Sequence, residues 1–224
     1  MTRNLSLLPL LLLISYSAVA FGDPATELAE AHGINDWQNV DELQFTFSVA
    51  KEPPVSRSWS WNVPEGRVSR TIEGNTAVIE LDNISSEADQ KIHQQFINDS
   101  FWLLFPFSVV WSEPEVTDHG LVSTTIDGSE IELNQVTALW PSDEGYTPGD
   151  AYDLFVDEDG TIRGWTFRKG NSEKGRFFVW RDPANLGPIQ VYQSYSVGES
   201  SDPFIEMKDL QIKLTGEDDW RTIP

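Results

Sequence analysis

The chain has 224 residues, with 15 Lys and Arg against 36 Asp and Glu, which gives a formal net charge of −21. A surface this acidic repels nucleic acid and anionic bilayers, so it argues against nucleic-acid binding. The chain has no cysteine, which excludes disulfides, thiolate metal sites and a lipid-modified N-terminal cysteine.

The first predicted element is an export signal at residues 1–20. Arg3 supplies the positive start, residues 5–14 form a short apolar run, and residues 18–20 (AVA) form a cleavage site of the A-x-A type. The apolar run is too short to cross a bilayer of roughly 30 Å, and no other segment approaches that length. We therefore expect a single domain over residues 21–224 that is periplasmic or secreted and does not span a membrane.

A short helix is predicted at residues 24–32, with Pro24 in its first turn and Gly33 after its end. Four strands are then expected at residues 43–49, 58–63, 67–72 and 76–81. The first of them alternates cleanly, with Leu43, Phe45 and Phe47 on one face and polar residues on the other.

The pattern changes to a helix over residues 85–99, which starts with serines and acidic residues. The most apolar stretch of the mature chain follows at residues 101–111, and Pro106 should end or kink any helix there. Strands then return at residues 120–126, 130–140, 151–157, 161–169, 176–182, 188–197 and 204–214. This order predicts an α+β fold dominated by one curved antiparallel sheet.

Catalytic and metal motifs are absent from the sequence. The three histidines are isolated, and although His32 or His119 could act as a base, surface or capping roles are far more common. The acidic run at residues 157–160 (DEDG) leads directly into a strand, so a hairpin turn explains it better than a calcium loop. There is no G-x-S-x-G elbow, Walker loop or G-x-G-x-x-G turn. We expect no enzyme activity, no metal and no cofactor.

The aromatic residues are the most informative feature, with 9 Trp, 12 Phe and 5 Tyr. Large apolar rings in a charged chain either fill a dry core or line a cavity for an apolar ligand. Periodicity places Trp59 beside Trp61 on one strand face, and Phe178 beside Trp180 on another. From this pattern alone both interpretations remain open, with the dry core the more common.

Three stretches of the chain resemble exported bacterial proteins of the LolA-like superfamily, and more narrowly an uncharacterised branch similar to outer-membrane lipoprotein-sorting proteins. They are AHGINDWQNVDELQFTFSV, INDSFWLLFPFSV and GDAYDLFVDEDGTIRGWTFRKG, taken in this order. The resemblance implies an incomplete, strongly curved antiparallel β-barrel with helices closing its mouth. It also implies that acyl chains or other lipids bind on the concave side. The side chains expected to line that cavity are Phe45, Phe47, Trp59, Trp61, Phe101, Trp102, Leu104, Phe105, Trp140, Trp165, Phe167, Phe178 and Trp180.

The leading hypothesis is a periplasmic binding or carrier protein for a lipid, an acyl chain or another hydrophobic small molecule. One alternative is a carbohydrate-binding protein or sugar enzyme, which would expose Trp59, Trp61, Trp140 and Trp165 on a flat or grooved face for stacking. The other is an interaction scaffold with a dry core, in which residues 101–107 dock to a protein of the cell envelope.

Overall fold

The computed structural model describes residues 22–142 and 147–223; the predicted export signal lies outside them. In chain order the elements are α1 (Pro24–Ala31), η1 (Ile34–Asn39), β1 (Val40–Val49), β2 (Val55–Asn62), β3 (Arg67–Ile72), β4 (Asn75–Glu80), α2 (Glu87–Trp111), β5 (Glu115–Ile126), β6 (Ser129–Leu139), β7 (Ala151–Val156), β8 (Ile162–Arg168), η2 (Lys169–Asn171), β9 (Arg176–Leu186), β10 (Ile189–Val197), β11 (Pro203–Leu214) and β12 (Arg221–Thr222).

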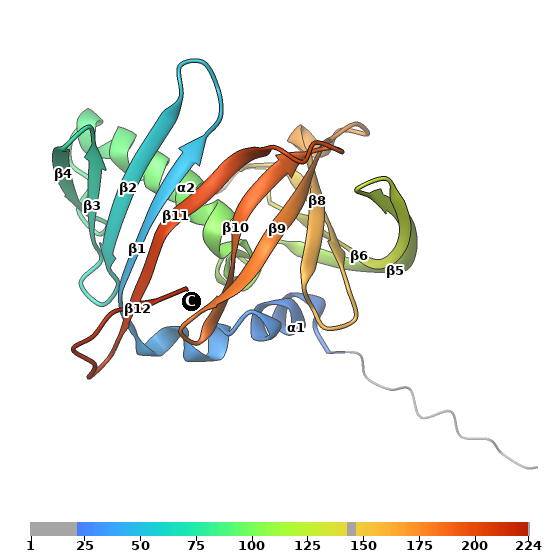
Figure 1. Ribbon diagram of the computed structural model, residues 1–224, viewed down its shortest axis with the longest axis horizontal. Helices are drawn as coiled ribbons and strands as arrows, with labels where there is room; N and C mark the ends of the chain where they lie inside the picture. The colour runs from blue at the N-terminus through green and yellow to red at the C-terminus, as the bar shows by residue number, and fades with distance from the viewer. Residues whose placement is uncertain (1–21, 143–146, 224) are drawn as a thin grey trace, which may run out of the picture.

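Within the described ranges, the strands form one antiparallel sheet in the order β4-β3-β2-β1-β11-β10-β9-β8-β7-β6-β5, and β12 pairs with β11. The first meander, β1 to β4, and the second, β5 to β11, are joined where β1 pairs with β11. Strands β4 and β5 therefore lie at opposite edges of the sheet, and α2 is the connection between them. The sheet stays open, and α2 lies across its concave side (Figure 1).

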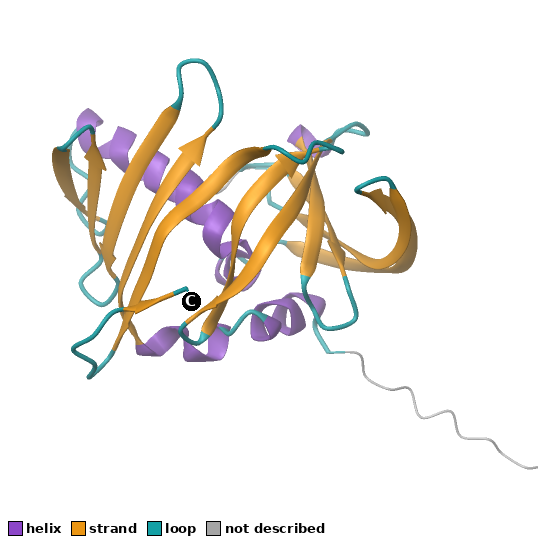
Figure 2. Ribbon diagram, viewed as in Figure 1, coloured by secondary structure: helices purple, strands orange, loops and turns teal. Residues whose placement is uncertain are grey.

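The curvature of the sheet is supported by β-bulges, which bend and twist a strand locally. Register shifts occur twice between β1 and β11, and once each in the pairs β10–β11, β5–β6 and β7–β8. The shift between β5 and β6 falls at Gly120, whose φ of +75° suits glycine. Strands β5 and β6 curl away from the rest of the sheet as a hooked hairpin (Figure 2).

Helix α2 starts with a capping box, in which Ser86 and Asp89 each accept a hydrogen bond from the other's backbone N–H. The helix continues through Pro106 to Trp111, and Leu104 has the non-helical angles φ −116° and ψ 25°. Proline has no N–H to donate to the residue four positions earlier, so it distorts the turn before it. The sequence predicts that Pro106 ends or kinks the helix, and the structure shows the kink.

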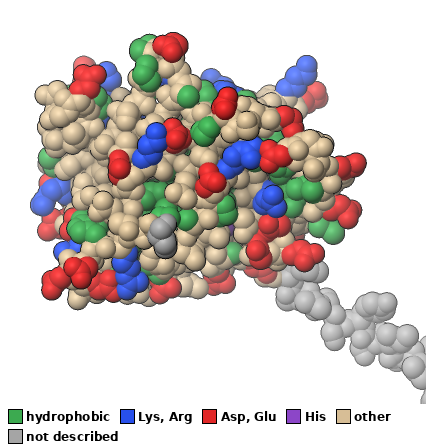
Figure 3. All heavy atoms as spheres, viewed as in Figure 1, with side chains coloured by type: hydrophobic (Ala, Val, Ile, Leu, Met, Phe, Trp, Pro, Cys, Tyr) green, Lys and Arg blue, Asp and Glu red, His purple; other side chains and the backbone are tan. Residues whose placement is uncertain are grey.

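The short helix α1 and η1 lie across one end of the half-barrel (Figure 1). Gly33 separates them with a φ of +90°, and its backbone approaches the Pro188 carbonyl so closely that a side chain there would clash. The outer face of the sheet carries acidic and basic side chains side by side, with scattered hydrophobic ones among them (Figure 3). This pattern is that of a solvated surface.

The predicted fold class is confirmed: the sheet is a curved, unclosed antiparallel barrel covered by helices. Several details differ from the prediction, among them strand β9, which extends to Leu186 where the pattern ends it at residue 182. The 3-10 helix η1 and the two-residue strand β12 have no strong sequence pattern. Strand β5 begins at Glu115 rather than at Gly120, because the bulge at Gly120 interrupts the register without ending the strand. Among the described residues, no helix is long and apolar enough to span a membrane.

Candidate functional site

Much of the concave face is filled by the aromatic side chains of α2. The Phe105 ring lies 4.6 Å from the Trp165 ring, and the Trp102 ring lies 4.7 Å from it, measured between centroids. Phe45, Trp59, Phe105 and Trp180 are each at most 3% exposed and belong to this packed core. These four residues were predicted to line a cavity, and they are packed in the core instead.

A groove remains at the end of the sheet opposite α1. It has a volume of about 600 Å³ and lies between α2 and the ends of β1, β2, β8, β9 and β11. This size falls within the range of small-molecule sites in proteins. Six of the predicted residues line it: Phe47, Phe101, Trp102, Trp165, Phe167 and Phe178.

A second cavity of about 500 Å³ is lined by three of the other predicted residues, Trp61, Leu104 and Trp140. Phe101 lines this cavity as well as the groove. The predicted set is thus divided between the groove, the second cavity and the dry core, and it does not line one basin.

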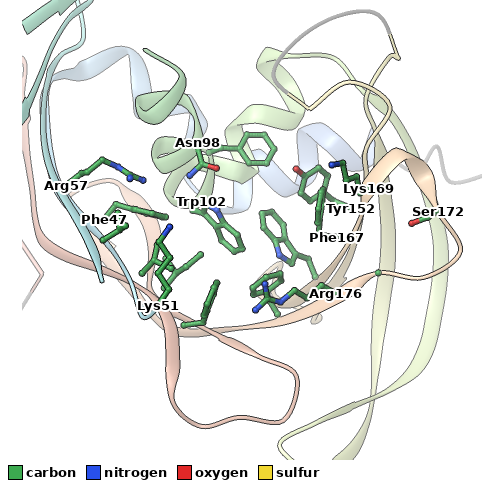
Figure 4. Close-up of a pocket in the computed structure, with 18 of the residues that line it drawn as sticks. Phe47, Lys51, Arg57, Asn98, Trp102, Tyr152, Phe167, Lys169, Ser172 and Arg176 are labelled. Atoms are coloured by element: carbon green, nitrogen blue, oxygen red, sulfur yellow. The ribbon is translucent and has the colours of Figure 1, made fainter. Parts of the chain in front are cut away.

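The groove also has basic residues that the sequence analysis did not select. They are Lys51, Arg57, Lys169, Lys174 and Arg176, and no Asp or Glu is among the described residues that line it. Figure 4 shows Lys51 and Arg57 on one side of the groove and Lys169 on the other, with aromatic rings between them. A groove with apolar rings and a positive rim therefore lies in a strongly acidic protein.

Arg57 is the one basic residue of this set whose charge is balanced by a described residue. Its Nε and Nη2 donate to the two carboxylate oxygens of Asp99 at 2.7 and 2.6 Å, and the Asp99 side chain is fully buried. The indole N–H of Trp59 donates to the same carboxylate at 2.8 Å. This cluster ties β2 to the middle of α2 along one wall of the groove.

Arg176 lies against two rings of the groove. Its guanidinium carbon is 4.9 Å from the centroid of Phe178 and 4.5 Å from that of Phe204. These distances are within cation–π range. A guanidinium can contact aromatic rings in this way while its N–H groups still donate to an anion.

Two further polar groups border the groove. The buried indole N–H of Trp165, a residue that lines the groove, has no hydrogen-bond partner among the described residues. Burial raises the pKa of Tyr152 to about 12, so its hydroxyl stays protonated at physiological pH. The Tyr152 hydroxyl is hydrogen-bonded to the Thr147 hydroxyl at 3.0 Å.

The loop between β8 and β9, residues 169–175, is held in place by Arg168. Its guanidinium donates to both oxygens of Asp153, at 2.7 and 2.9 Å, and also to Asn171 and to the Ser172 carbonyl. Lys169 and Lys174 flank these anchor points, so the loop presents both lysines from a fixed backbone.

No group of three or more His, Asp or Glu among the described residues is placed to hold a metal ion. His32 is buried and hydrogen-bonds to the Leu28 carbonyl at 2.8 Å and to the Tyr192 hydroxyl at 3.1 Å. His119 lies exposed on β5 beside Thr137. Neither histidine lines the groove.

No family model and no curated protein matches the chain. Among solved structures, it is similar to a DUF1329 family protein from Desulfovibrio piger, with a TM-score of 0.44 and 11% identity, covering 88% of this chain and 96% of the other. It is also similar to a domain from Vibrio parahaemolyticus described as an outer membrane lipoprotein-sorting protein, with a TM-score of 0.45, 7% identity and the same two coverages. Both likenesses concern the overall fold alone.

Proposed function

We propose that residues 21–224 form a single periplasmic domain that binds or carries a lipid, an acyl chain or another hydrophobic small molecule. The observation that supports this proposal is the groove beside α2. It is lined by Phe47, Trp102 and Phe178 among other apolar side chains, and the core rings leave it unfilled.

The energetics of such a ligand follow from its buried surface. Each buried methylene contributes about 0.8 kcal/mol, so a chain that buries ten methylenes gains roughly 8 kcal/mol before the costs of association. Rings such as Trp102 and Phe178 have few rotatable bonds, so ordering them around a ligand costs little entropy. A moderate length of acyl chain is therefore enough for useful affinity.

The two alternatives fit the structure less well. Sugar stacking needs exposed tryptophans, but Trp59, Trp140 and Trp165 are at most 4% exposed. Docking of residues 101–107 to an envelope protein needs these side chains on the surface. Most of them are instead buried under the sheet, Phe105 and Phe107 among them.

The test is native mass spectrometry of the protein purified from the periplasm, with organic extraction of what accompanies it. We expect a stoichiometric lipid or acyl species. Val55 lies at the start of β2 in the groove, and Val55→Trp should fill the space and lower ligand occupancy. Val78 is 53% exposed on β4, outside the groove, and Val78→Trp is the matched control.

Loss of ligand in Val55→Trp but not in Val78→Trp supports the proposal. A protein that carries no ligand, and takes up neither fatty acids nor phospholipids on incubation, contradicts it. Equal occupancy in both variants would place the ligand outside this groove.

A further inference from the structure

We propose that the groove selects an amphiphile with an anionic headgroup, a carboxylate or a phosphate attached to an acyl chain. This inference rests on the proposed function and specifies its ligand class. The headgroup is bound by the basic rim of the groove, and the chain lies against the aromatic rings.

The first argument is the distribution of charge. The chain has 15 basic and 36 acidic residues, yet five basic residues and no described acidic residue line this one groove. Glu52 and Glu173 are sequence neighbours of two of the lysines, but both are exposed and neither lines the groove. In so acidic a chain, a carboxylate-free groove with five cations is the reverse of the overall composition.

The second argument is that most of this charge is uncompensated. Arg57 is neutralised by Asp99. The other four basic residues of the groove form no ion pair with a described residue: Lys51, Lys169, Lys174 and Arg176. Outside the groove, six of the nine described basic residues pair with an acidic side chain, Arg67, Arg163 and Arg181 among them. An anionic ligand would supply the missing counter-charge.

The third argument is the arrangement of the cations around an apolar floor. Lys51 comes from the β1–β2 loop and Lys169 from the β8–β9 loop, and both loops lie at the same end of the sheet (Figure 1). Arg176 rests on Phe178 and Phe204, so its guanidinium is at the boundary between charge and rings (Figure 4). A headgroup at this boundary could accept hydrogen bonds from Arg176 in the paired geometry that carboxylates and phosphates favour.

The net charge of −21 does not prevent this. At physiological ionic strength, interactions between exposed charges are largely screened beyond a Debye length of about 8 Å. A headgroup inside the groove is therefore affected mainly by the cations beside it. The distant acidic residues slow the association of an anionic ligand more than they destabilise the bound complex.

The experiment compares ligands that have the same chain and different headgroups. Delipidated protein is titrated with laurate, dodecyl phosphate and dodecanol, each below its aggregation threshold, and binding is followed by calorimetry. We expect at least one of the two anions to bind about tenfold more tightly than dodecanol, the effect of one charge-assisted contact. That advantage should shrink as salt is added.

Two matched variants test the assignment to the rim. Lys51→Gln/Lys169→Gln/Lys174→Gln removes three positive charges from the groove, and should abolish most of the preference for the anion. The control removes the same charge elsewhere, through Lys91→Gln/Lys208→Gln/Lys213→Gln, and should leave the preference intact. Arg176→Gln separately tests the guanidinium. Dodecanol binding by every variant verifies that the groove is still formed.

The outcomes separate the two proposals. Tight binding of laurate alone identifies a carboxylate ligand, and tight binding of dodecyl phosphate alone identifies a phosphate ligand; either supports the inference. Equal binding of all three compounds overturns the headgroup inference and leaves the proposed function standing. An equal loss of anion preference in both triple variants also overturns it. Failure of all three compounds to bind contradicts the proposed function itself.

Discussion

The hydroxyl of Tyr195 on β10 donates a hydrogen bond of 2.7 Å to the backbone carbonyl of Trp102 in α2. Trp102 lies four residues before Pro106, so this carbonyl loses its normal helical donor. The sheet thus satisfies the group that the proline leaves free. The contact lies next to the kink at Leu104, in the segment whose Trp102 ring lines the groove.

Tyr195→Phe should therefore destabilise the protein, because it leaves the Trp102 carbonyl without its partner. We expect a loss of about 1–3 kcal/mol in the free energy of unfolding, measured by urea denaturation. In a Pro106→Ala background the new backbone N–H can bond to that carbonyl, so Tyr195→Phe should cost less. An equal cost in both backgrounds would contradict this account of the kink.

The individual strands and helices could be predicted from local patterns, but the strand pairing that joins the two meanders into one sheet could not. The alternation of Leu43, Phe45 and Phe47 identifies a strand with one buried face, because side chains alternate across a sheet. The pairing of β1 with β11 joins residues more than 150 positions apart, and no local pattern specifies such a partner. The same limit applies to Pro106: the sequence leaves open whether the helix ends or kinks there, and the Tyr195 contact that accompanies the kink comes from a distant strand.

The candidate site was predictable only in part. Periodicity finds apolar faces, and Phe47, Phe167 and Phe178 do line the groove. Periodicity cannot distinguish them from Phe45 and Trp59, whose side chains are packed in the core. The basic rim could not be predicted because its lysines lie in loops. In a loop, no sequence periodicity indicates which way a side chain points. The high density of basic residues in 168–176, in an otherwise acidic chain, was the available signal.

Stability should depend on pH through His32. Burial lowers the pKa of His32 below its ordinary value of 6.5, despite its hydrogen bond to the Leu28 carbonyl. Below pH 6.5 the unfolded chain then binds more protons than the folded one, so the free energy of unfolding falls as the pH decreases. The slope is at most about 1.4 kcal/mol per pH unit for each proton.

The measurement is urea denaturation between about pH 5 and 7, a range above the ordinary pKa of carboxylates. His32→Gln should flatten the dependence while lowering stability at neutral pH. Burial also lowers the pKa of His93, so His93→Gln is the matched comparison and should keep the larger share of the slope. An unchanged slope in His32→Gln would assign the dependence to another group.

The buried carboxylate of Asp99 should make Arg57 important for stability. Arg57→Met leaves that carboxylate with the donors of Trp59 and Asn98 but without its counter-charge. We expect a loss of about 3–5 kcal/mol in the free energy of unfolding. Arg57→Met/Asp99→Leu should be less destabilised, because no isolated charge remains. Arg67→Met, whose ion pairs are exposed to solvent, should leave the free energy of unfolding nearly unchanged.

Arg168 should control the β8–β9 loop and, through it, the basic rim. Arg168→Met removes the hydrogen bonds to Asp153 and to the loop backbone, each worth about 1.5–3 kcal/mol when charged. Opening of residues 169–175 should then become at least about tenfold more frequent. Trypsin cleavage after Lys169 and Lys174 reports that opening, since cleavage follows the population of the open loop.

The matched control for Arg168→Met is Arg163→Met, on the same strand, whose ion pair with Asp157 is longer and partly exposed. It should leave cleavage in the loop unchanged. If the loop positions the rim, Arg168→Met should also weaken laurate binding while dodecanol binding persists, because the lysines lose their fixed placement but the rings do not. Faster cleavage with unchanged laurate affinity would show that the lysines act without the order that Arg168 imposes.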